Sequence, residues 1–261
     1  MRYQVTDRDE PGLCVQTRRE TDVLIITLQR EDRRNAIDRS MADAIDAALN
    51  LLDDDGEIRC GVLTGGTRVF CAGSDLRSKG DYVTSRGGEY GIIRRRRRKP
   101  LVAAVEGLAL GGGMEIALAC DLVVAADNAR FGLPEVMRGV VPTCGALFRA
   151  VQALPPNLAR EMILTGEPID APRAYAAGWV NRLAQPGQAL SEALALAQRI
   201  SANAPLSVQG SLEAMNSWLA CHDREGWEAT ERALTGIRGS EDTQEGIRAF
   251  FERRPPVWRG R

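Results

Sequence analysis

Two glutamates in apolar surroundings are the residues of this sequence best suited to acid-base chemistry. Glu115 lies in "GGGMEIALAC", three residues after Gly112 and directly before an apolar run, so a helix over residues 113–120 would bury its carboxylate. Glu135 lies in "FGLPEVMRG", directly after a proline and between two glycines. A buried carboxylate is costly unless it is paired or functional. Taken singly, however, each glutamate fits a structural hydrogen-bonding role as well as a catalytic one.

Two glycine-rich turns supply backbone amides that can stabilise a negative charge. In "VLTGGTRVFCAGSDL" a strand leads to small residues that let the backbone approach a ligand closely. In "VEGLALGGGMEIALAC" three glycines precede a helix, and the amides of a helix N-terminus point outwards at the positive end of its dipole. Such a turn alone is also a common structural feature. The dinucleotide fingerprint would need a glycine at Ile116 and the Walker pattern is absent, so the spacing favours an oxyanion over a nucleotide phosphate.

The sequence lacks the residue patterns that other classes of catalytic site require. The chain has one histidine, His222, and six cysteines without a Cys-x-x-Cys pair, so we expect no metal site. The Gly-x-Ser-x-Gly pattern is absent, which disfavours a Ser-His-Asp mechanism. His222 falls at a predicted helix end and is interpreted as a surface residue. Cys71 and Cys144 are close enough in sequence to the proposed site to line it.

Alternating strands and helices must position these groups. We expect strands over 13–18, 23–29, 58–65, 100–107, 121–127 and 179–184, and helices from about Ser40 onwards and over 113–120. Ser40 is the predicted N-cap of the first helix. From about residue 146 the pattern is mainly helical, with helices that end at Gly166 and Gly178. The order indicates an α/β layered core in residues 1–200 followed by a helical appendage in residues 201–261.

Charge and hydropathy limit the partners and the compartment. The 34 basic and 35 acidic side chains give a net charge of −1, which argues against a general nucleic-acid binder. The exception is Arg94–Lys99, which we interpret as a solvated helix end or loop, with an anionic ligand or RNA as the alternatives. No run of residues is long and apolar enough for a membrane helix, and the N-terminus lacks the apolar segment of a signal peptide. We therefore expect a cytoplasmic protein with reduced thiols.

Several segments together resemble one family. "RRNAI", "VFCAGSDL", "KPLVAAVEGLALGGGMEIALACDLVVAAD", "ARFGLPEV", "LTGEPIDAPRAYAAGWVNRL" and "EGIRAFFERRPPVWRGR" occur in the order and spacing of the crotonase, or enoyl-CoA hydratase/isomerase, superfamily. The resemblance covers residues 14–261. It implies a spiral of β-β-α units with a C-terminal helical region used for trimerisation, trimers that often pair into hexamers, an acyl-coenzyme A substrate, and no cofactor or metal.

The resemblance also implies roles for individual residues. The backbone amides of Ser74 and Gly112 correspond to the oxyanion hole, and Glu115 and Glu135 correspond to the paired acid-base groups. The remaining positions match residues that contact coenzyme A: Arg34, Ala36, Ala72, Asp75 and Leu76 in two turns, with Phe250 and Arg253 reaching it from a neighbouring subunit. On this basis Glu115 is expected to activate water, and Glu135 to manage the proton at the α carbon.

The resemblance leaves the reaction partly open. After Glu135 the usual hydratase pattern of glycines is replaced by "VVPTCGALFRA", which puts the acyl-chain preference in doubt. Both glutamates favour hydration or dehydration of an enoyl-CoA. The alternatives are double-bond isomerisation, other crotonase-type chemistry such as carnitinyl-CoA dehydration, RNA binding through Arg94–Lys99, and a non-catalytic oligomeric partner. Stereochemistry, pathway and the choice between trimer and hexamer are not predicted.

Overall fold

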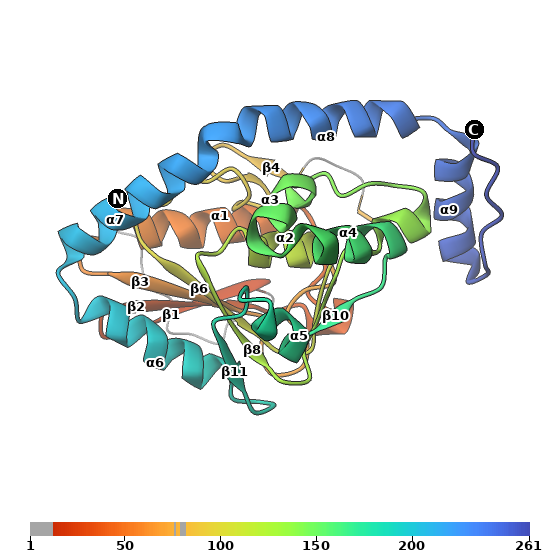
Figure 1. Ribbon diagram of the computed structural model, residues 1–261. Helices are drawn as coiled ribbons and strands as arrows, with labels where there is room; N and C mark the ends of the chain where they lie inside the picture. Colours follow the sequence, from red (N-terminus) through yellow and green to blue (C-terminus); the bar gives the residue numbers. More distant parts are fainter. Residues whose placement is uncertain (1–12, 76, 79–81) are drawn as a thin grey trace.

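A six-stranded sheet forms the centre of the computed structural model, which describes residues 13–75, 77–78 and 82–261 (Figure 1). Its strand order is β1-β2-β3-β6-β8-β11. The first pair is antiparallel and every later pair is parallel. The strands are β1 (Val15–Glu20), β2 (Val23–Leu28), β3 (Cys60–Thr64), β6 (Leu101–Val105), β8 (Leu122–Ala126) and β11 (Arg182–Ala184).

A second, smaller sheet runs beside the first and gives the chain its spiral path. It contains β7 (Leu108–Leu110), β9 (Arg130–Gly132) and β10 (Ile169–Asp170) in the order β10-β9-β7. An isolated parallel bridge between Cys71 and Ala109 extends this sheet towards the chain that follows β3. Each turn of the chain thus adds one strand to each sheet before a helix, as β6, β7 and α2 (Gly112–Leu118) do. The predicted spiral of β-β-α units is confirmed.

Helices cover both faces of the large sheet, which explains why its central strands are apolar throughout. In β6, Leu101, Ala103 and Val105 belong to the core beneath α1 (Arg39–Asp54). Val102 and Ala104 face the other way, against α6 (Ala189–Ser201). Figure 1 shows α1 and α6 on opposite sides of the sheet.

The first helix begins close to the predicted position, but a different residue caps it. Asp38, not Ser40, is the N-cap of α1, because its Oδ1 accepts a hydrogen bond of 2.9 Å from the backbone N–H of Met41. The two glycines predicted to end helices do so in left-handed conformations, Gly166 with φ +73° and Gly178 with φ +84°. The last strand of the sheet, β11, is shorter than predicted and starts at Arg182.

The remaining elements are short or belong to the second half of the chain. They are η1 (Glu31–Arg33), β4 (Val83–Thr84), β5 (Gly88–Glu89), η2 (Pro134–Arg138), α3 (Ala146–Ala153), α4 (Pro156–Thr165), α5 (Ala171–Ala176), α7 (Pro205–Leu219), η3 (Ala220–His222), α8 (Asp223–Ile237) and α9 (Glu241–Glu252). In Figure 1, α7 and α8 run along one side of the molecule and α9 lies at its end. The division at residue 200 stays a prediction. Among the residues that the structure describes, no helix is both long and apolar enough to cross a membrane.

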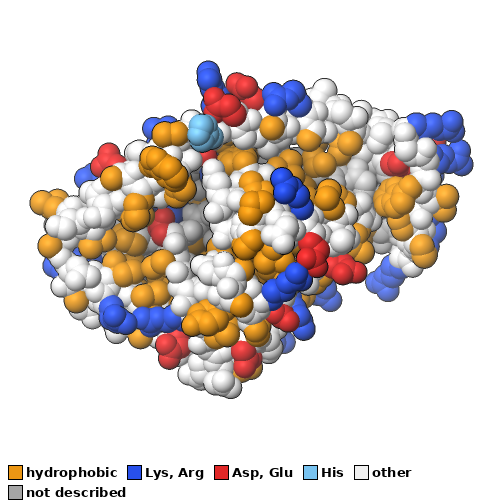
Figure 2. All heavy atoms as spheres, in the orientation of Figure 1, with side chains coloured by type: hydrophobic (Ala, Val, Ile, Leu, Met, Phe, Trp, Pro, Cys, Tyr) orange, Lys and Arg blue, Asp and Glu red, His pale blue; other side chains and the backbone are white. Residues whose placement is uncertain are grey.

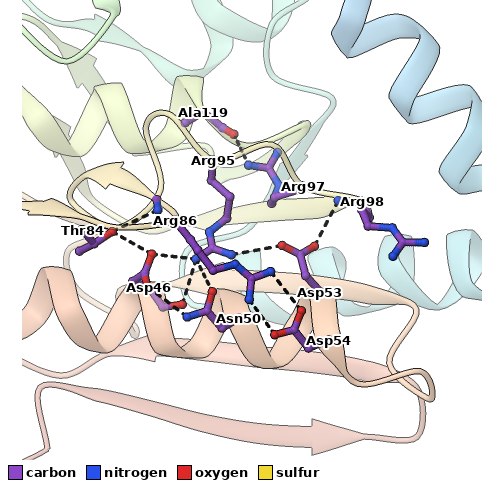
Figure 3. Close-up of polar contacts among 11 residues, drawn as sticks. Asp46, Asn50, Asp53, Asp54, Thr84, Arg86, Arg95, Arg97, Arg98 and Ala119 are labelled. Atoms are coloured by element: carbon purple, nitrogen blue, oxygen red, sulfur yellow. Dashed lines mark hydrogen bonds and ion pairs between the residues drawn. The ribbon is translucent and has the colours of Figure 1, made fainter.

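The arginine run is a loop, which was one of the two predicted forms, but it is solvated only in part, at Arg94, Arg96 and Arg98. Arg94–Lys99 follows turns and irregular backbone rather than a helix. Arg95 and Lys99 are buried, and the Arg97 side chain is only 5% exposed. Figure 3 shows the Arg95 side chain directed at Asp46 and Asp53 of α1, and the backbone N–H of Arg98 also bonds Asp53. The burial of Arg95 was not predicted because its acidic partners, Asp46 and Asp53, lie more than 40 residues away along the chain.

Candidate active site

The two glycine-rich turns meet in the fold. Gly73 has φ +92°, and a Cβ atom built on it would lie 2.9 Å from the Gly112 nitrogen and 3.0 Å from the Leu110 oxygen. Only glycine therefore allows this close approach. The Cys71–Ala109 bridge and a hydrogen bond of 3.0 Å from the Leu110 N–H to the Cys71 oxygen hold the turns together.

The amides of Ser74 and Gly112 are available for a ligand. Gly112 is the first residue of α2, so its N–H has no partner within the helix. Ser74 pairs with Ile37 in a bridge whose hydrogen bonds use the Gly73 oxygen and the Asp75 amide, not the Ser74 amide. Within the described part of the chain, neither amide has a hydrogen-bond acceptor. Two free donors on adjacent turns are what an oxyanion requires.

Glu115 lies one helical turn beyond these amides and is only 2% exposed. Its Oε1 accepts hydrogen bonds from the backbone N–H groups of Cys144, at 2.7 Å, and Ala146, at 3.2 Å. The start of α3 thus orients the carboxylate. These two amides were not among the predicted site residues, although they belong to "VVPTCGALFRA", the segment that departs from the family pattern.

The Glu135 carboxylate faces the same amide cluster from another segment of the chain. Glu135 lies in η2 (Pro134–Arg138), which is capped by Gly139 with φ +65°. A Cβ atom on Gly111 would lie 3.1 Å from Glu135 Oε1, so the carboxylate faces the residue that precedes Gly112. Its Oε2 is buried and has no hydrogen-bond partner among the described residues. An unpaired buried acceptor of this kind suits a proton or a substrate atom.

Burial raises the proton affinity of both carboxyl groups. Burial and, second to it, the negative charge of Glu135 raise the pKa of Glu115 to about 7, against the lowering effect of the amides of Ala146 and Cys144. Burial also raises the pKa of Glu135 to about 7, against the lowering effects of its own backbone amide and of Arg138. Near neutral pH the two groups can therefore exchange between acid and carboxylate, as general acid-base catalysis requires.

The two turns predicted to hold coenzyme A lie side by side. The Ala72 N–H donates to the Arg34 oxygen at 3.0 Å, and the Arg30 guanidinium bonds both the Ala36 oxygen at 2.6 Å and Asp75 Oδ2 at 3.1 Å. Arg34 has φ +53°, which fixes the shape of its turn. The contact of these turns with coenzyme A stays a prediction, and Leu76 lies outside the described residues.

The two predicted residues of the tail lie apart from this group within the chain. Phe250 is on α9, where the Arg138 guanidinium lies 4.6 Å from its ring centre, and Arg253 is exposed just after the same helix. Thr243 Oγ1 also donates a hydrogen bond of 2.7 Å to the Gly139 oxygen. In the chain described, α9 therefore supports the turn that carries Glu135. No contact in the described part of the structure joins Phe250 or Arg253 to Gly112 or Glu115.

One aromatic residue of the site was missed by the sequence analysis. Tyr90 is 4% exposed, and its hydroxyl lies 2.7 Å from Ser74 Oγ. Its ring packs on Gly112, because a Cβ atom there would lie 2.8 Å from two ring carbons. The glycines around it in "RGGEYGI" were the available signal. His222 is exposed, and the described residues contain no group of three or more His, Cys, Asp or Glu able to hold a metal ion.

Comparison with known proteins shows the family of the chain. The family model described as enoyl-CoA hydratase/isomerase matches residues 18–261. The chain is 37% identical to the enoyl-CoA hydratase EchA19 of Mycobacterium tuberculosis, over 96% of this chain and 97% of the relative. It is 36% identical to the mevalonyl-coenzyme A hydratase sidH of Aspergillus fumigatus, over 91% of each chain.

A solved structure shows the same fold. The crystal structure of carnitinyl-CoA hydratase from Mycobacterium avium is 40% identical and superimposes with a TM-score of 0.90, over 95% of this chain and 99% of the other. The α/β spiral is thus the fold of a crotonase-type enzyme. The chain belongs to the enoyl-CoA hydratase/isomerase family.

Proposed function

We propose that this protein is an enoyl-CoA hydratase-like lyase, which adds water to the α-β double bond of an acyl-CoA thioester or removes it. The observation that carries the proposal is the convergence of two free amides and two buried glutamates. Gly112 supplies one amide, Glu115 lies one helical turn later, and Glu135 faces Gly111. The hydratases among the relatives support the same reaction class.

The geometry suggests a role for each group. The Ser74 and Gly112 amides would hold the thioester oxygen and stabilise the enolate-like charge, and loss of one such donor costs about 3 kcal/mol in transition-state stabilisation. Glu115, as a carboxylate, would take a proton from water while the water oxygen bonds to the β carbon. Glu135 as carboxylic acid would give its proton to the α carbon. The reverse sequence removes water, and the two raised pKa values supply one acid and one base near neutral pH.

Binding and assembly complete the proposal. The turns at Arg34–Ala36 and Ala72–Asp75 would hold the coenzyme A moiety, which enters as part of the substrate; we propose no separate cofactor. We also propose a homotrimer, or a hexamer of two trimers, assembled through the C-terminal helices. The cytoplasm stays the expected compartment. RNA binding gains no support, since Arg95, Arg97 and Lys99 are occupied by partners within the chain.

An assay of acyl-CoA thioesters tests the function. Purified protein would be incubated with short, medium and hydroxylated acyl-CoA thioesters, and the products analysed by mass spectrometry and by loss of enone absorbance. We expect the mass of one water to be gained by an enoyl-CoA, or lost from a 3-hydroxyacyl-CoA. A shift of the double bond without a mass change would instead favour isomerase activity. Inactivity on the whole panel would exclude the proposal.

A further inference from the structure

Tyr90 occupies a backbone conformation that an aromatic residue rarely adopts. Its φ is +56°, and the flanking Gly88 and Gly91 have φ of +67° and +77°. A Cβ atom on Gly91 would lie 2.4 Å from the Ala42 oxygen of α1, so the turn is pressed against that helix. Left-handed backbone at a bulky residue costs about 1–3 kcal/mol and persists only where the surroundings enforce it. The turn therefore holds the Tyr90 ring in a fixed place.

That place adjoins both residues of the candidate oxyanion hole. The Tyr90 hydroxyl bonds to Ser74 Oγ at 2.7 Å. A Cβ atom on Gly112 would lie 2.6 Å from the same hydroxyl oxygen, so the ring leaves room for glycine alone. Any thioester oxygen held by the amides of Ser74 and Gly112 consequently has the Tyr90 side chain as a neighbour.

The Tyr90 hydroxyl also lies close to the residue that holds Glu115. Cys144, whose amide donates to Glu115 Oε1 at 2.7 Å, lies with its thiol within interaction range of the Tyr90 hydroxyl. Burial raises the pKa of Tyr90 well above its usual value, and the negative charges of Cys144 and Glu115 add to the rise. Tyr90 thus borders the region between the amides and Glu115, which the α and β carbons of the acyl group must cross for water to add.

We infer that Tyr90 is the specificity-determining residue of the acyl site and limits the acyl group to a short chain. The inference rests on the proposed function for the position of the thioester. Carbons beyond the β carbon would meet a ring that is 4% exposed, bonded to Ser74 and packed on Gly112. Closely packed interiors do not absorb extra methylenes without shifting neighbours, and the strained turn leaves this ring little freedom to shift.

Calorimetric binding of saturated acyl-CoA thioesters tests this inference. Butyryl-CoA and octanoyl-CoA lack the double bond and are not hydrated, so their dissociation constants report the room for the acyl chain alone. We expect wild-type protein to bind octanoyl-CoA at least roughly tenfold more weakly than butyryl-CoA. Tyr90→Ala should remove this preference, whereas Tyr90→Phe, which keeps the ring and loses only the hydroxyl, should retain it. If Tyr90→Ala does not fold, Tyr90→Leu replaces it, with the same expected direction.

The outcomes separate this inference from the proposed reaction. An unchanged ratio in the Ala or Leu variant, or an equal change in the Phe variant, would overturn the role of the ring. A changed ratio together with no hydration of any enoyl-CoA would support the role of the ring and refute the hydratase. Failure of wild-type protein to bind either thioester would refute both.

Discussion

Glu115 and Glu135 have different hydrogen-bond surroundings, and the difference indicates which of them acts as base and which as acid. Two backbone amides bond Glu115 Oε1, whereas Glu135 keeps a buried oxygen without a partner among the described residues. Hydrogen bonds from backbone amides stabilise the charged form of a carboxyl group. Burial without such partners stabilises the protonated form. This asymmetry fits a base at Glu115 and an acid at Glu135.

Replacement of the proposed acid tests this assignment. Glu135→Gln keeps the shape of the side chain but cannot release a proton, so we expect kcat for enoyl-CoA hydration to fall about 100- to 10,000-fold. Glu167→Gln, an identical change at an exposed position, is the control and should leave kcat unchanged. Steady-state kinetics with crotonyl-CoA measure both variants. A near wild-type rate in Glu135→Gln would refute the role of Glu135.

The raised pKa of Glu135 also predicts a pH-dependent stability. The folded-state pKa is about 7 and the unfolded value is 4.5, so the folded protein binds the proton more tightly. The free energy of unfolding is therefore highest below the unfolded pKa and falls as pH rises through the folded pKa, by about 3 kcal/mol in total. Gln cannot titrate, so Glu135→Gln should gain stability relative to wild type between about pH 5 and about pH 8. Urea unfolding at both pH values measures the difference; a gain towards acid pH would contradict it.

The site could be predicted only in part from single residues. The glutamates and the Gly112 amide lie in short motifs, because a catalytic carboxylate and a helix N-terminus are local features of the chain. Tyr90 reaches Ser74 across 16 residues and Gly112 across 22, and the glycines beside it indicate a turn without indicating which residues the ring contacts. The amides of Cys144 and Ala146 were likewise hidden, since their partner Glu115 precedes them by about 30 residues.

At the scale of elements, side chains of α1 hold the loop that carries Tyr90 in place. Arg95 bonds Asp46 Oδ1 at 2.8 Å and Asp53 Oδ2 at 3.2 Å, both on α1 (Figure 3). The side chains of Arg95 and Asp53 are 2% and 4% exposed. Buried charges of this kind stabilise a fold only as long as every member keeps its partner.

Removal of the Arg95 cation should therefore destabilise the protein strongly. Arg95→Met leaves Asp46 and Asp53 without their buried partner, and we expect a loss of about 3–5 kcal/mol in the free energy of unfolding. Arg96→Met changes the exposed neighbour and should stay within about 0.5 kcal/mol of wild type. Urea denaturation followed by circular dichroism compares them. Equal stability of the two variants would show that the run is a solvated surface after all.

The elements themselves followed from the sequence better than their contacts did. Buried strands such as β6 and helix ends such as Gly166 have local signals, namely continuous apolar runs and a glycine able to adopt positive φ. Arg94–Lys99 has no such signal, because a basic side chain is solvated or buried according to which carboxylates the fold brings to it. The acidic partners on α1 lie too far from Arg94–Lys99 in the sequence for a local pattern to predict the pairing.

At the scale of the whole molecule, α7 presents an apolar surface that a single chain leaves uncovered. Leu206, Met215 and Trp218 are 81%, 58% and 75% exposed, and Figure 2 shows apolar side chains gathered over this helix. Leu212 is the one residue of α7 that is buried. A large exposed apolar patch marks an interaction site, and the proposed trimer, which assembles through the C-terminal helices, supplies another copy of the chain to cover it.

A charge placed in this surface should dissociate the assembly. Trp218→Glu puts a carboxylate where the proposed interface would desolvate it, so we expect the mass in solution to fall from a trimer or hexamer towards the single chain of 28.4 kDa. Ser217→Glu adds the same charge at the adjacent exposed position of α7 and is the matched control. Because successive residues of a helix point about 100° apart, the control charge can remain in water while the Trp218 variant cannot. Size-exclusion chromatography with light scattering gives both masses. A wild-type protein that elutes as a single chain would contradict the proposed assembly, and a Trp218→Glu variant that remains fully assembled would place the interface elsewhere.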